Sequence, residues 1–476
     1  MKNKIFTLLL PLLLFAGEEN PLPLFVTQHE ILLENGPLAY EATTGIIEIG
    51  DDPETAASLF FLSYTTGDPD RPITFVFPGG PGSAGTLEAI VSLGPRRLLT
   101  AAEGRRILPP YRMIDNPETL LATTDIVFVD PVGSGYSRAE SDELLPYFYS
   151  TEGDIQTLGE FVHAYVSLFD RWNSPKYLSG GSYGTLRCCG LAENLLQYDL
   201  WIHGILLHGC AFQSSTLSSE RDHFLPDAFL IPTFAATAWR HGRLWPEKTL
   251  EETIDYARRF VYDAYIPAML QPSRLSLPEQ ASFYQQLAHL IGLPLDTVRK
   301  YLGRINETLY TAEFFAPDRK LLGGLDTRYS GDFDTIAPAR QDPSYLDSLG
   351  IGAAFQSYLQ TELETPPLAP KYISFSWETL QQWRTAAYDT QGEPDLLQRL
   401  RRVMIYNPFM KVFVGAGLYD CRTPFAAVEY CFDHLNLSPS TQNRLQFEYY
   451  PAGHAFIFDL PSLQKFKRDL TRFYQE

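Results

Sequence analysis

Cysteine is scarce in this sequence, and its spacing is irregular. The 476 residues include five cysteines: Cys188, Cys189, Cys210, Cys421 and Cys431. So few thiols at such spacings exclude a disulfide scaffold and a cysteine-based zinc site. Because the count is odd, at least one thiol stays unpaired, and we expect most of them to be buried and inert. Cys421 and Cys431 are the pair to test for a disulfide in an oxidising compartment.

Positive charge and long apolar runs are also in short supply. Lys and Arg number 38 against 57 Asp and Glu, which gives a formal net charge of -19. The resulting field repels nucleic acid and anionic lipid, so we expect no nucleic-acid partner. Beyond the N-terminus no window approaches 18 uninterrupted apolar residues, and we therefore expect no membrane span. The sequence also lacks internal repeats and low-complexity tracts.

The first residues have the pattern of an export signal. Lys2 and Lys4 precede an apolar run from Ile5 to Phe15, and the small pair Ala16-Gly17 follows it. The run is too short to cross a bilayer, and Pro11 within it argues against a buried strand. The pattern predicts a signal peptide over residues 1–17 and an exported protein, either periplasmic or secreted.

Short apolar runs bounded by turn residues predict β-strands along much of the chain. Several are apolar throughout, which is typical of strands buried on both faces of a mostly parallel sheet with helices on both sides. The predicted strands are Leu59–Tyr64, Ile73–Phe77, Ile126–Val129, Tyr177–Ser179, Ile205–His208, Lys411–Val414 and Phe447–Tyr450, with crossover helices over Asp154–Asp170 and Thr185–Gln197.

The strand pattern is interrupted between residues 212 and 402, where helical segments rich in Tyr, Arg, Leu and Pro take its place. We predict an α/β core in two parts, residues 18–211 and 403–476, with a mainly helical cap inserted at 212–402. A cap over the carboxyl edge of such a sheet is one physical way to build a substrate pocket. A cap that only packs is the alternative.

A Gly-x-Ser-x-Gly motif stands between a predicted strand and a predicted helix. It reads Gly180-Gly181-Ser182-Tyr183-Gly184. A tight strand-to-helix turn strains the backbone of the serine, and glycines two residues to either side let the strand and the helix approach each other. We predict that Ser182 is a nucleophile. The alternative is a glycine-rich turn with a solvated serine.

Two further residues complete a catalytic set in the order serine, acid, base. Asp420 follows the strand that begins at Lys411, and His454 follows the strand that begins at Phe447. Alone, each has an ordinary explanation, as a turn-forming Asp or a satisfied His. Together they predict that His454 is the general base for Ser182 and that Asp420 orients this histidine.

Negative charge that develops on an acyl oxygen needs two backbone donors, which together form an oxyanion hole. The amide after the nucleophile, that of Tyr183, is the first candidate. The glycine-rich loop Phe77–Ser83 directly follows a predicted strand, and Gly80 within it is the candidate for the second amide. A simple tight turn is the alternative for this loop.

With this set of motifs the sequence resembles the serine carboxypeptidases, and most closely their bacterial branch, within the α/β-hydrolase superfamily. The resemblance implies an α/β-hydrolase fold and hydrolysis of the C-terminal residue of a peptide substrate through an acyl-enzyme intermediate, without a metal or an organic cofactor. The motifs that carry it run in order: Gly79–Ser83, Leu93–Arg97, Asp115–Pro117, Asp130–Ser137, Arg171–Lys176, the turn at Ser182, Gly417–Asp420 and Pro451–His454.

Three positions depart from the family pattern. Family members hold the free carboxylate of the substrate with an Asn before the paired glycines, a Glu before the nucleophile and often an acid before the Leu-Gly-Pro turn. Pro78, Gly181 and Ser92 stand at these places, and neither proline nor glycine brings a side-chain donor. The family's preference for acidic pH, which the paired acids are thought to cause, should therefore be absent here.

We expect substrate contacts at Gly79, Gly181 and Arg187. A guanidinium has the fork geometry that suits a carboxylate, which makes Arg187 or Arg96 a hypothetical replacement for the missing side chains. Both arginines have the alternative explanation of ordinary surface or helix residues. The sequence does not indicate an oligomeric state.

The Gly180–Gly184 motif, with glycine before the serine, also resembles the prolyl and tripeptidyl aminopeptidases of the same fold. An aminopeptidase needs acidic side chains from the cap to bind a peptide N-terminus. The segment from Glu247 to Asp255 contains some, although its pattern is equally that of a solvated helix face. The same scaffold could also serve an esterase or a non-catalytic binding protein. The complete triad weighs against a binding protein.

Overall fold

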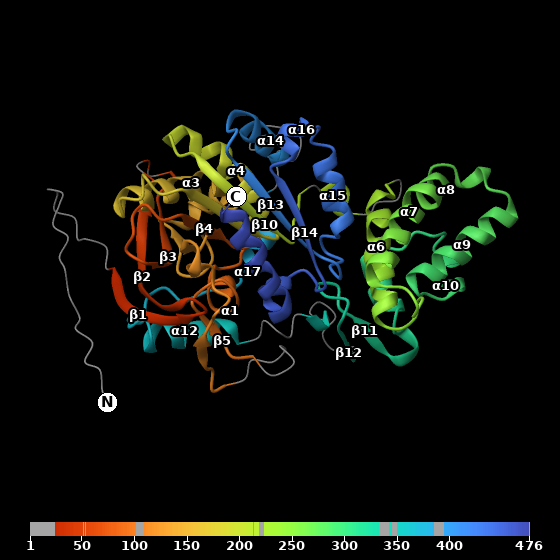
Figure 1. Cartoon of the computed structure of the whole chain (residues 1–476), viewed down its shortest axis with the longest axis horizontal. Helices are drawn as coiled ribbons and strands as arrows, with labels where there is room; N and C mark the ends of the chain where they lie inside the picture. Colours follow the sequence, from red (N-terminus) through yellow and green to blue (C-terminus); the bar gives the residue numbers. More distant parts are fainter. Residues whose placement is uncertain are drawn as a thin grey trace.

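A large sheet lies at the centre of the protein (Figure 1). The computed structural model describes residues 24–475 except 51, 53, 101–108, 213, 219–222, 333–341, 345–349 and 385–394. The predicted signal peptide lies outside the described residues. In the part of the chain that is described, no helix is long and apolar enough to cross a membrane. Nor do three or more Cys, His, Asp or Glu side chains gather there in a way that could hold a metal ion.

Parallel strands make up the larger part of this sheet. Except for the edge strand Leu445–Tyr450, which is mostly half-buried, they are buried along most of their length because helices cover both faces. This burial explains why their sequences are largely apolar without alternation. These strands confirm those that the apolar runs predict. In order across the sheet they are β7 (Asp125–Val129), β4 (Ile73–Phe77), β9 (Lys176–Gly181), β10 (Ile202–His208), β13 (Lys411–Gly417) and β14 (Leu445–Tyr450).

Antiparallel strands extend the sheet beyond β7. The strand β3 (Ala57–Thr65) pairs with β7, and β2 (Gly36–Ile49) and β1 (Phe25–Leu33) follow it to the edge. Along β1 exposed and half-buried residues alternate, because one face of this edge strand is solvated. Neither β1 nor β2 is among the strands predicted from the sequence.

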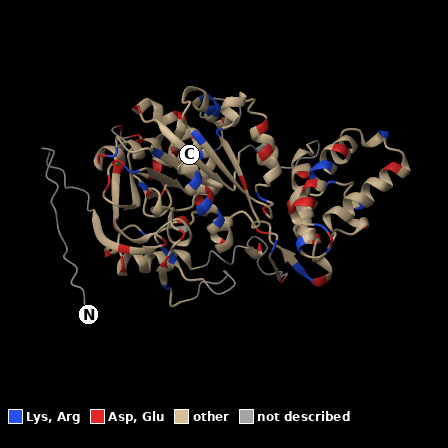
Figure 2. Ribbon diagram, in the orientation of Figure 1, with Lys and Arg blue, Asp and Glu red and all other residues tan. Residues whose placement is uncertain are grey.

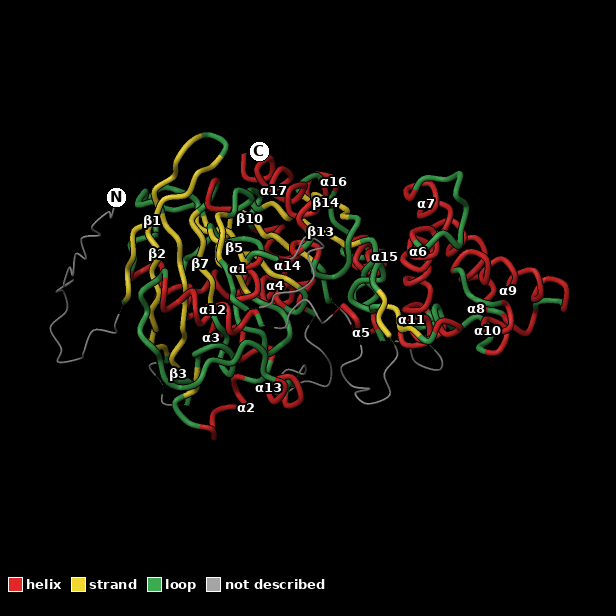
Figure 3. The backbone as a smooth tube through the Cα atoms, turned by 90° about the horizontal axis from the view of Figure 1, so that it is seen from below, coloured by secondary structure: helices red, strands yellow, loops and turns green. Residues whose placement is uncertain are grey.

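Neighbouring residues of each strand face two different cores, one on each side of the sheet. Phe75 and Leu207 belong to the first core, whereas Val76 and Leu206 belong to the second. Figure 3 shows the strands between the helices that cover them. The first side is covered by α3 (Thr151–Leu168), α4 (Gly184–Asn194), α14 (Leu396–Tyr406) and α15 (Phe425–Asp433), and the second by α1 (Thr86–Val91), α12 (Ile351–Thr361) and α17 (Leu460–Gln475).

Between β10 and β13 the chain leaves the sheet and builds a helical lobe, at the far end of the molecule from β1 (Figures 1 and 3). The lobe has a core of its own, in which the rings of Phe234 and Tyr310 stack with centroids 3.7 Å apart. Capping boxes at Thr249 and Ser276 satisfy the first amides of two of its helices. The helices of the lobe are α6 (Leu225–Arg240), α7 (Leu250–Phe260), α8 (Ile266–Leu270), α9 (Leu277–Ile291), α10 (Leu295–Lys300) and α11 (Glu307–Glu313).

Only part of the inserted region belongs to this lobe, because α12 and α14 pack on the central core. Acidic and basic residues are interspersed over both the core and the lobe (Figure 2). The remaining short elements are β5 (Arg96–Leu98), β6 (Met113–Asp115), β8 (Arg138–Ala139), α2 (Leu145–Phe148), α5 (Ser214–Leu217), β11 (Lys320–Leu322), β12 (Ser330–Asp332), α13 (Trp377–Gln382) and α16 (Pro439–Gln442).

Candidate active site

Ser182 lies in a sharp turn between β9 and α4. Its φ angle is 52°, a left-handed conformation that strains a residue with a side chain. The turn requires small neighbours, since a Cβ atom at Gly180 would lie 2.8 Å from Cys188 Sγ. The Ser182 amide donates to the His208 carbonyl oxygen at 2.9 Å, which ties the turn to the end of β10. This is the geometry that presents a serine hydroxyl at the carboxyl edge of a sheet.

Asp420 and His454 form a hydrogen-bonded pair after β13 and β14. His454 Nδ1 lies 2.8 Å from Asp420 Oδ2, and the Asp420 side chain is fully buried. The carboxylate also accepts from the amides of Arg422 and Thr423, at 2.7 and 3.0 Å, and from the Thr423 hydroxyl at 2.5 Å. An ionised carboxylate can only accept, so Nδ1 carries a proton and Nε2 is left to act as a base.

Charge coupling shifts the pKa values of both partners. Burial alone would lower the pKa of His454, but the adjacent Asp420 carboxylate raises it above the ordinary value of 6.5. Burial alone would raise the pKa of Asp420, but His454 and Thr423 hold it below its ordinary range. Asp420 therefore stays ionised, and its negative charge favours the protonated form of His454.

The order of the strands brings the serine and the histidine to the same edge of the sheet. Only β10 and β13 separate β9 from β14, and parallel strands end on the same side. A Cβ atom at Gly209, directly after β10, would lie 3.3 Å from His454 Cε1, while Ser182 bonds to His208. Within the described residues Ser182 Oγ has no hydrogen-bond partner. Catalytic hydrogen bonds of this kind often tighten only in the substrate complex.

The loop after β4 passes directly beside Ser182. A Cβ atom at Gly79 would lie 2.8 Å from Ser182 Cβ, and Gly80 has a φ angle of 110°, which favours glycine. Tyr183 caps the N-terminus of α4, where helix amides lack acceptors and the helix dipole is positive. Among the described residues, neither the Gly80 amide nor the Tyr183 amide donates to an acceptor. Both predicted oxyanion donors therefore lie next to Ser182 in sequence or in space.

Arg187 does not face the substrate, contrary to the hypothesis from the sequence. Its side chain is 1% exposed and forms a two-pronged ion pair with Asp154 of α3, at 2.7 and 3.2 Å. Its remaining nitrogen donates to the Pro78 carbonyl oxygen. With every prong engaged inside the protein, this guanidinium is not available to a carboxylate. It tethers the glycine loop at Gly79 to the helix layer instead.

The other charged groups suggested by the sequence also have structural roles. Arg96 forms ion pairs with Asp115 and Glu362. The acidic segment from Glu247 to Asp255 covers the start of α7, where Glu252 completes a capping box. The two glycines expected to contact the substrate differ in exposure. Gly79 is half-buried beside Ser182, whereas Gly181 is buried.

A buried acid and a buried imidazole that the sequence did not reveal lie against Gly181. A Cβ atom at Gly181 would be 2.9 Å from His208 Nδ1 and 3.1 Å from Glu88 Oε1. His208 Nε2 is 3.4 Å from Glu88 Oε2. These two side chains, from β10 and α1, fill the space that a side chain at position 181, directly before Ser182, would occupy. An acid in an apolar stretch is a weak sequence sign of a buried carboxylate, and Glu88 has this sign. The sequence around His208 has no feature that would predict the contact.

All five cysteines are buried and free, so Cys421 and Cys431 form no disulfide. Burial raises the pKa of each of these thiols. A buried thiol that resists ionisation is a poor nucleophile. This agrees with the expectation of inert cysteines.

Comparisons with a family model and with curated proteins both find similarity to serine carboxypeptidases. The family model described as serine carboxypeptidase matches residues 34–222. Two Arabidopsis thaliana proteins, serine carboxypeptidase-like 11 and serine carboxypeptidase-like 2, are 24% and 26% identical to this chain. Each match covers 35% of this chain, and 41% and 40% of the respective relative. The matched segment thus spans about two fifths of the length of these relatives.

The similarity of fold extends over a longer part of the chain. The crystal structure of Kex1(delta)p, a prohormone-processing carboxypeptidase from Saccharomyces cerevisiae, superposes with a TM-score of 0.58 at 14% identity. The alignment covers 91% of each chain. The α/β-hydrolase fold predicted from the sequence is therefore confirmed.

Proposed function

We propose that this chain, a relative of the serine carboxypeptidases, is a serine-type carboxypeptidase that removes C-terminal residues from peptides through an acyl-enzyme intermediate. The observation that carries the proposal is the hydrogen-bonded pair of His454 and Asp420 at the same sheet edge as the strained Ser182. The motifs around these three residues are also among those by which the sequence resembles the family.

In the first half of the reaction, Ser182 Oγ attacks the carbonyl carbon of the last peptide bond, and His454 Nε2 takes the hydroxyl proton. The Gly80 and Tyr183 amides stabilise the negative charge on the carbonyl oxygen. When the C–N bond breaks, the proton passes from His454 to the leaving nitrogen. The C-terminal residue departs with a free amine, and the rest of the peptide remains as an ester on Ser182.

In the second half, a water molecule gives a proton to His454 and adds to the acyl carbon. The ester C–O bond then breaks, and the proton returns from His454 to Ser182 Oγ, which regenerates the enzyme. Asp420 holds the imidazole and stays ionised throughout. The scheme uses groups of the chain itself and needs no metal or organic cofactor.

A panel of end-blocked peptides tests this proposal. We expect cleavage of peptides that have an acetylated N-terminus and a free C-terminal carboxylate, and no cleavage by the Ser182→Ala variant. A fluorophosphonate probe should form one adduct, on Ser182, in the folded wild-type protein. Absence of the adduct would favour a non-catalytic binding protein, whereas cleavage of small acyl esters alone would favour an esterase.

An aminopeptidase is the second candidate, because the lobe places an acid close to the triad. Glu307 of α11 lies 3.1 Å from Arg422 Nε, beside Asp420, and burial raises its pKa to about 6. It borders a cavity of about 150 Å³ together with Cys421 and Pro424. An acid at this place could bind the ammonium group of a peptide N-terminus. Cleavage that requires a free N-terminus and tolerates a C-terminal amide would favour this function.

We further propose that the protein is exported to the periplasm or secreted, on the basis of residues 1–17. N-terminal sequencing of the protein recovered from the periplasm or the medium should begin at Glu18. Recovery of the full-length chain from the cytoplasm would contradict the proposal.

A further inference from the structure

A short segment of the inserted region contacts two of the three loops that carry the proposed triad, those of Asp420 and His454. This segment, Gly323–Arg328, connects β11 to β12, and we call it the brace. The Thr327 amide donates to the Tyr419 carbonyl at 3.0 Å, and the Cys421 amide donates to the Gly324 carbonyl at 3.1 Å. The brace therefore bonds to the backbone on both sides of Asp420, the triad acid.

The same segment binds the loop of the triad base. The His454 amide donates to the Leu325 carbonyl at 2.6 Å, and the Gly453 amide donates to Asp326 Oδ2 at 3.1 Å. The approach is so close that a Cβ atom at Gly453 would lie 2.6 Å from Asp326 Cα. Glycine before the histidine is thus a packing requirement of the brace.

Asp326 and Arg328 fix the brace against the base loop. Asp326 is 8% exposed, and its carboxylate pairs with the Arg328 guanidinium at 2.7 Å. Arg328 also donates to the Pro451 carbonyl at 3.0 Å and pairs with Asp459 at 3.0 Å. Hydrogen bonds therefore hold the chain on both sides of His454 to one ion pair in the insertion.

The brace is also connected to the helical lobe. The hydroxyl of Thr327 lies 2.6 Å from that of Thr237 in α6, and the Thr327 carbonyl is 2.8 Å from His241 Nε2. Asp342, further along the insertion, accepts from the Gly324 amide at 3.0 Å. The lobe, the brace and the two triad loops thus form one continuous hydrogen-bonded unit.

We propose that the brace, through Asp326, is a positioning element that holds the Asp420 loop and the His454 loop at the separation catalysis requires. The proposal rests on the proposed function, because it takes the triad to be catalytic. A general base has to lie within a few tenths of an ångström of its working place, and a misplacement of about 1 Å can cost roughly 100-fold in rate. On this view the insertion contributes to the reaction rate as well as covering the core.

The test is the variant Asp326→Ala, which removes the acceptor of the Gly453 amide and one of the two carboxylate partners of Arg328. We expect the rate of fluorophosphonate labelling and kcat to fall about 10- to 100-fold, with little change in KM. Because Asp420 raises the pKa of His454, a loosened pair should also move the acidic limb of the kcat/KM profile to lower pH. Glu307 and Arg422, the other charged groups that act on His454, are unchanged in this variant.

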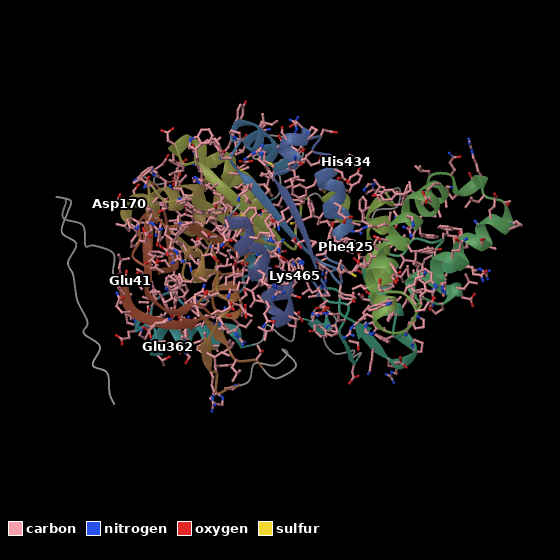
Figure 4. The ribbon with its side chains drawn as sticks, viewed as in Figure 1. Glu41, Asp170, Glu362, Phe425, His434 and Lys465 are labelled. Atoms are coloured by element: carbon pink, nitrogen blue, oxygen red, sulfur yellow. The ribbon has the colours of Figure 1, made fainter. Side chains whose placement is uncertain are left out.

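Glu429→Gln is the matched control. Glu429 of α15 pairs with Arg258 of α7 at 2.5 Å, so it also joins the insertion to the core. Phe425, labelled in Figure 4, lies at the start of α15 on the side that faces the inserted helices, and the Arg258 guanidinium lies over its ring. We expect this variant to lose stability as Asp326→Ala does, while it keeps the wild-type kcat and pH profile.

The outcomes separate the inference from the proposed function. If the wild-type protein does not react with the probe, the proposed function fails. If the wild type reacts and Asp326→Ala matches Glu429→Gln in kcat and in pH profile, the brace proposal is overturned. Should Asp326→Ala not fold, Asp326→Asn keeps the shape, removes the charge and replaces one of the two acceptor oxygens by an NH2 group. A wild-type kcat and an unmoved acidic limb in Asp326→Asn would then overturn the proposal, and a fall in kcat with a shifted limb would support it.

Discussion

Replacing Arg187 by methionine should separate a structural role from a substrate-binding role. Methionine has similar length and no charge, so the variant leaves the Asp154 carboxylate buried, at 5% exposure, without its partner. Removing one member of a buried ion pair costs about 3–5 kcal/mol, because the remaining charge is uncompensated. We expect urea unfolding of Arg187→Met at pH 7 to show a loss of that order.

The pH dependence of this loss has a definite sign. Burial already raises the pKa of Asp154 above its ordinary value, and Arg187 opposes that rise. Without the arginine the pKa rises further, and a buried acid with a raised pKa loses stability as the pH increases from its unfolded value of 3.8. The stability deficit relative to wild type should therefore be smaller at pH 5 than at pH 8.

The double variant Arg187→Met/Asp154→Leu completes the test. Replacing a whole buried ion pair by apolar groups is often neutral or stabilising, so unfolding should return close to wild type. Activity should not return, since the Pro78 carbonyl still lacks the donor that holds the glycine loop. We expect kcat to stay about tenfold low with KM unchanged, less than the loss of an oxyanion donor itself. Wild-type stability of Arg187→Met together with a raised KM for free-carboxylate peptides would refute this reasoning.

Three further predictions rest on the same contacts. The acidic limb of the kcat/KM profile should lie above pH 6.5, because the pKa of His454 is raised and the neutral base is lost as the pH falls through that pKa. A limb well below pH 6.5 would contradict the pairing of His454 with Asp420. Gly181→Glu should destabilise the protein in thermal unfolding, because the new side chain meets His208 and Glu88; adding His208→Gly should recover much of the loss, and a fully stable single variant would contradict the packing. Ellman's reagent should find no reactive thiol in the folded protein and five after denaturation, because all five thiols are buried and free; a lower final count would indicate a disulfide.

The parallel part of the sheet could be predicted because its strands are apolar on both faces. A run such as Ile73–Phe77 stands out from its surroundings whatever it packs against. The edge strand β1 could not be predicted, for the opposite reason. One face of β1 is solvated, so its sequence Phe25–Leu33 mixes Gln, His and Glu with apolar residues and carries no continuous run.

The candidate triad could be proposed from the sequence because each member follows a recognisable strand. Its supporting groups could not, because they meet only in three dimensions. Arg187 and Asp154 are 33 residues apart, and nothing in either segment tells a buried pair from two surface charges. The same holds for Glu88 and His208, which come together across the edge of the sheet. Without knowledge of its partner Asp154, Arg187 has only the fork geometry that suits a carboxylate, and the sequence therefore predicts a substrate contact for it.

The contacts of the inserted region could not be predicted from the sequence either, and they determine which of its residues tolerate substitution. Residues 323–328 have the composition of an ordinary polar loop, yet their backbone bonds to the loops that carry Asp420 and His454. The helices α6 to α11 have a core of their own, so their outer surfaces can vary without disturbing the sheet. The brace cannot vary in that way, because Gly453 and His454 bond directly to it. Substitutions that alter specificity should therefore be tolerated on the lobe, whereas those that move the brace should alter the rate for every substrate.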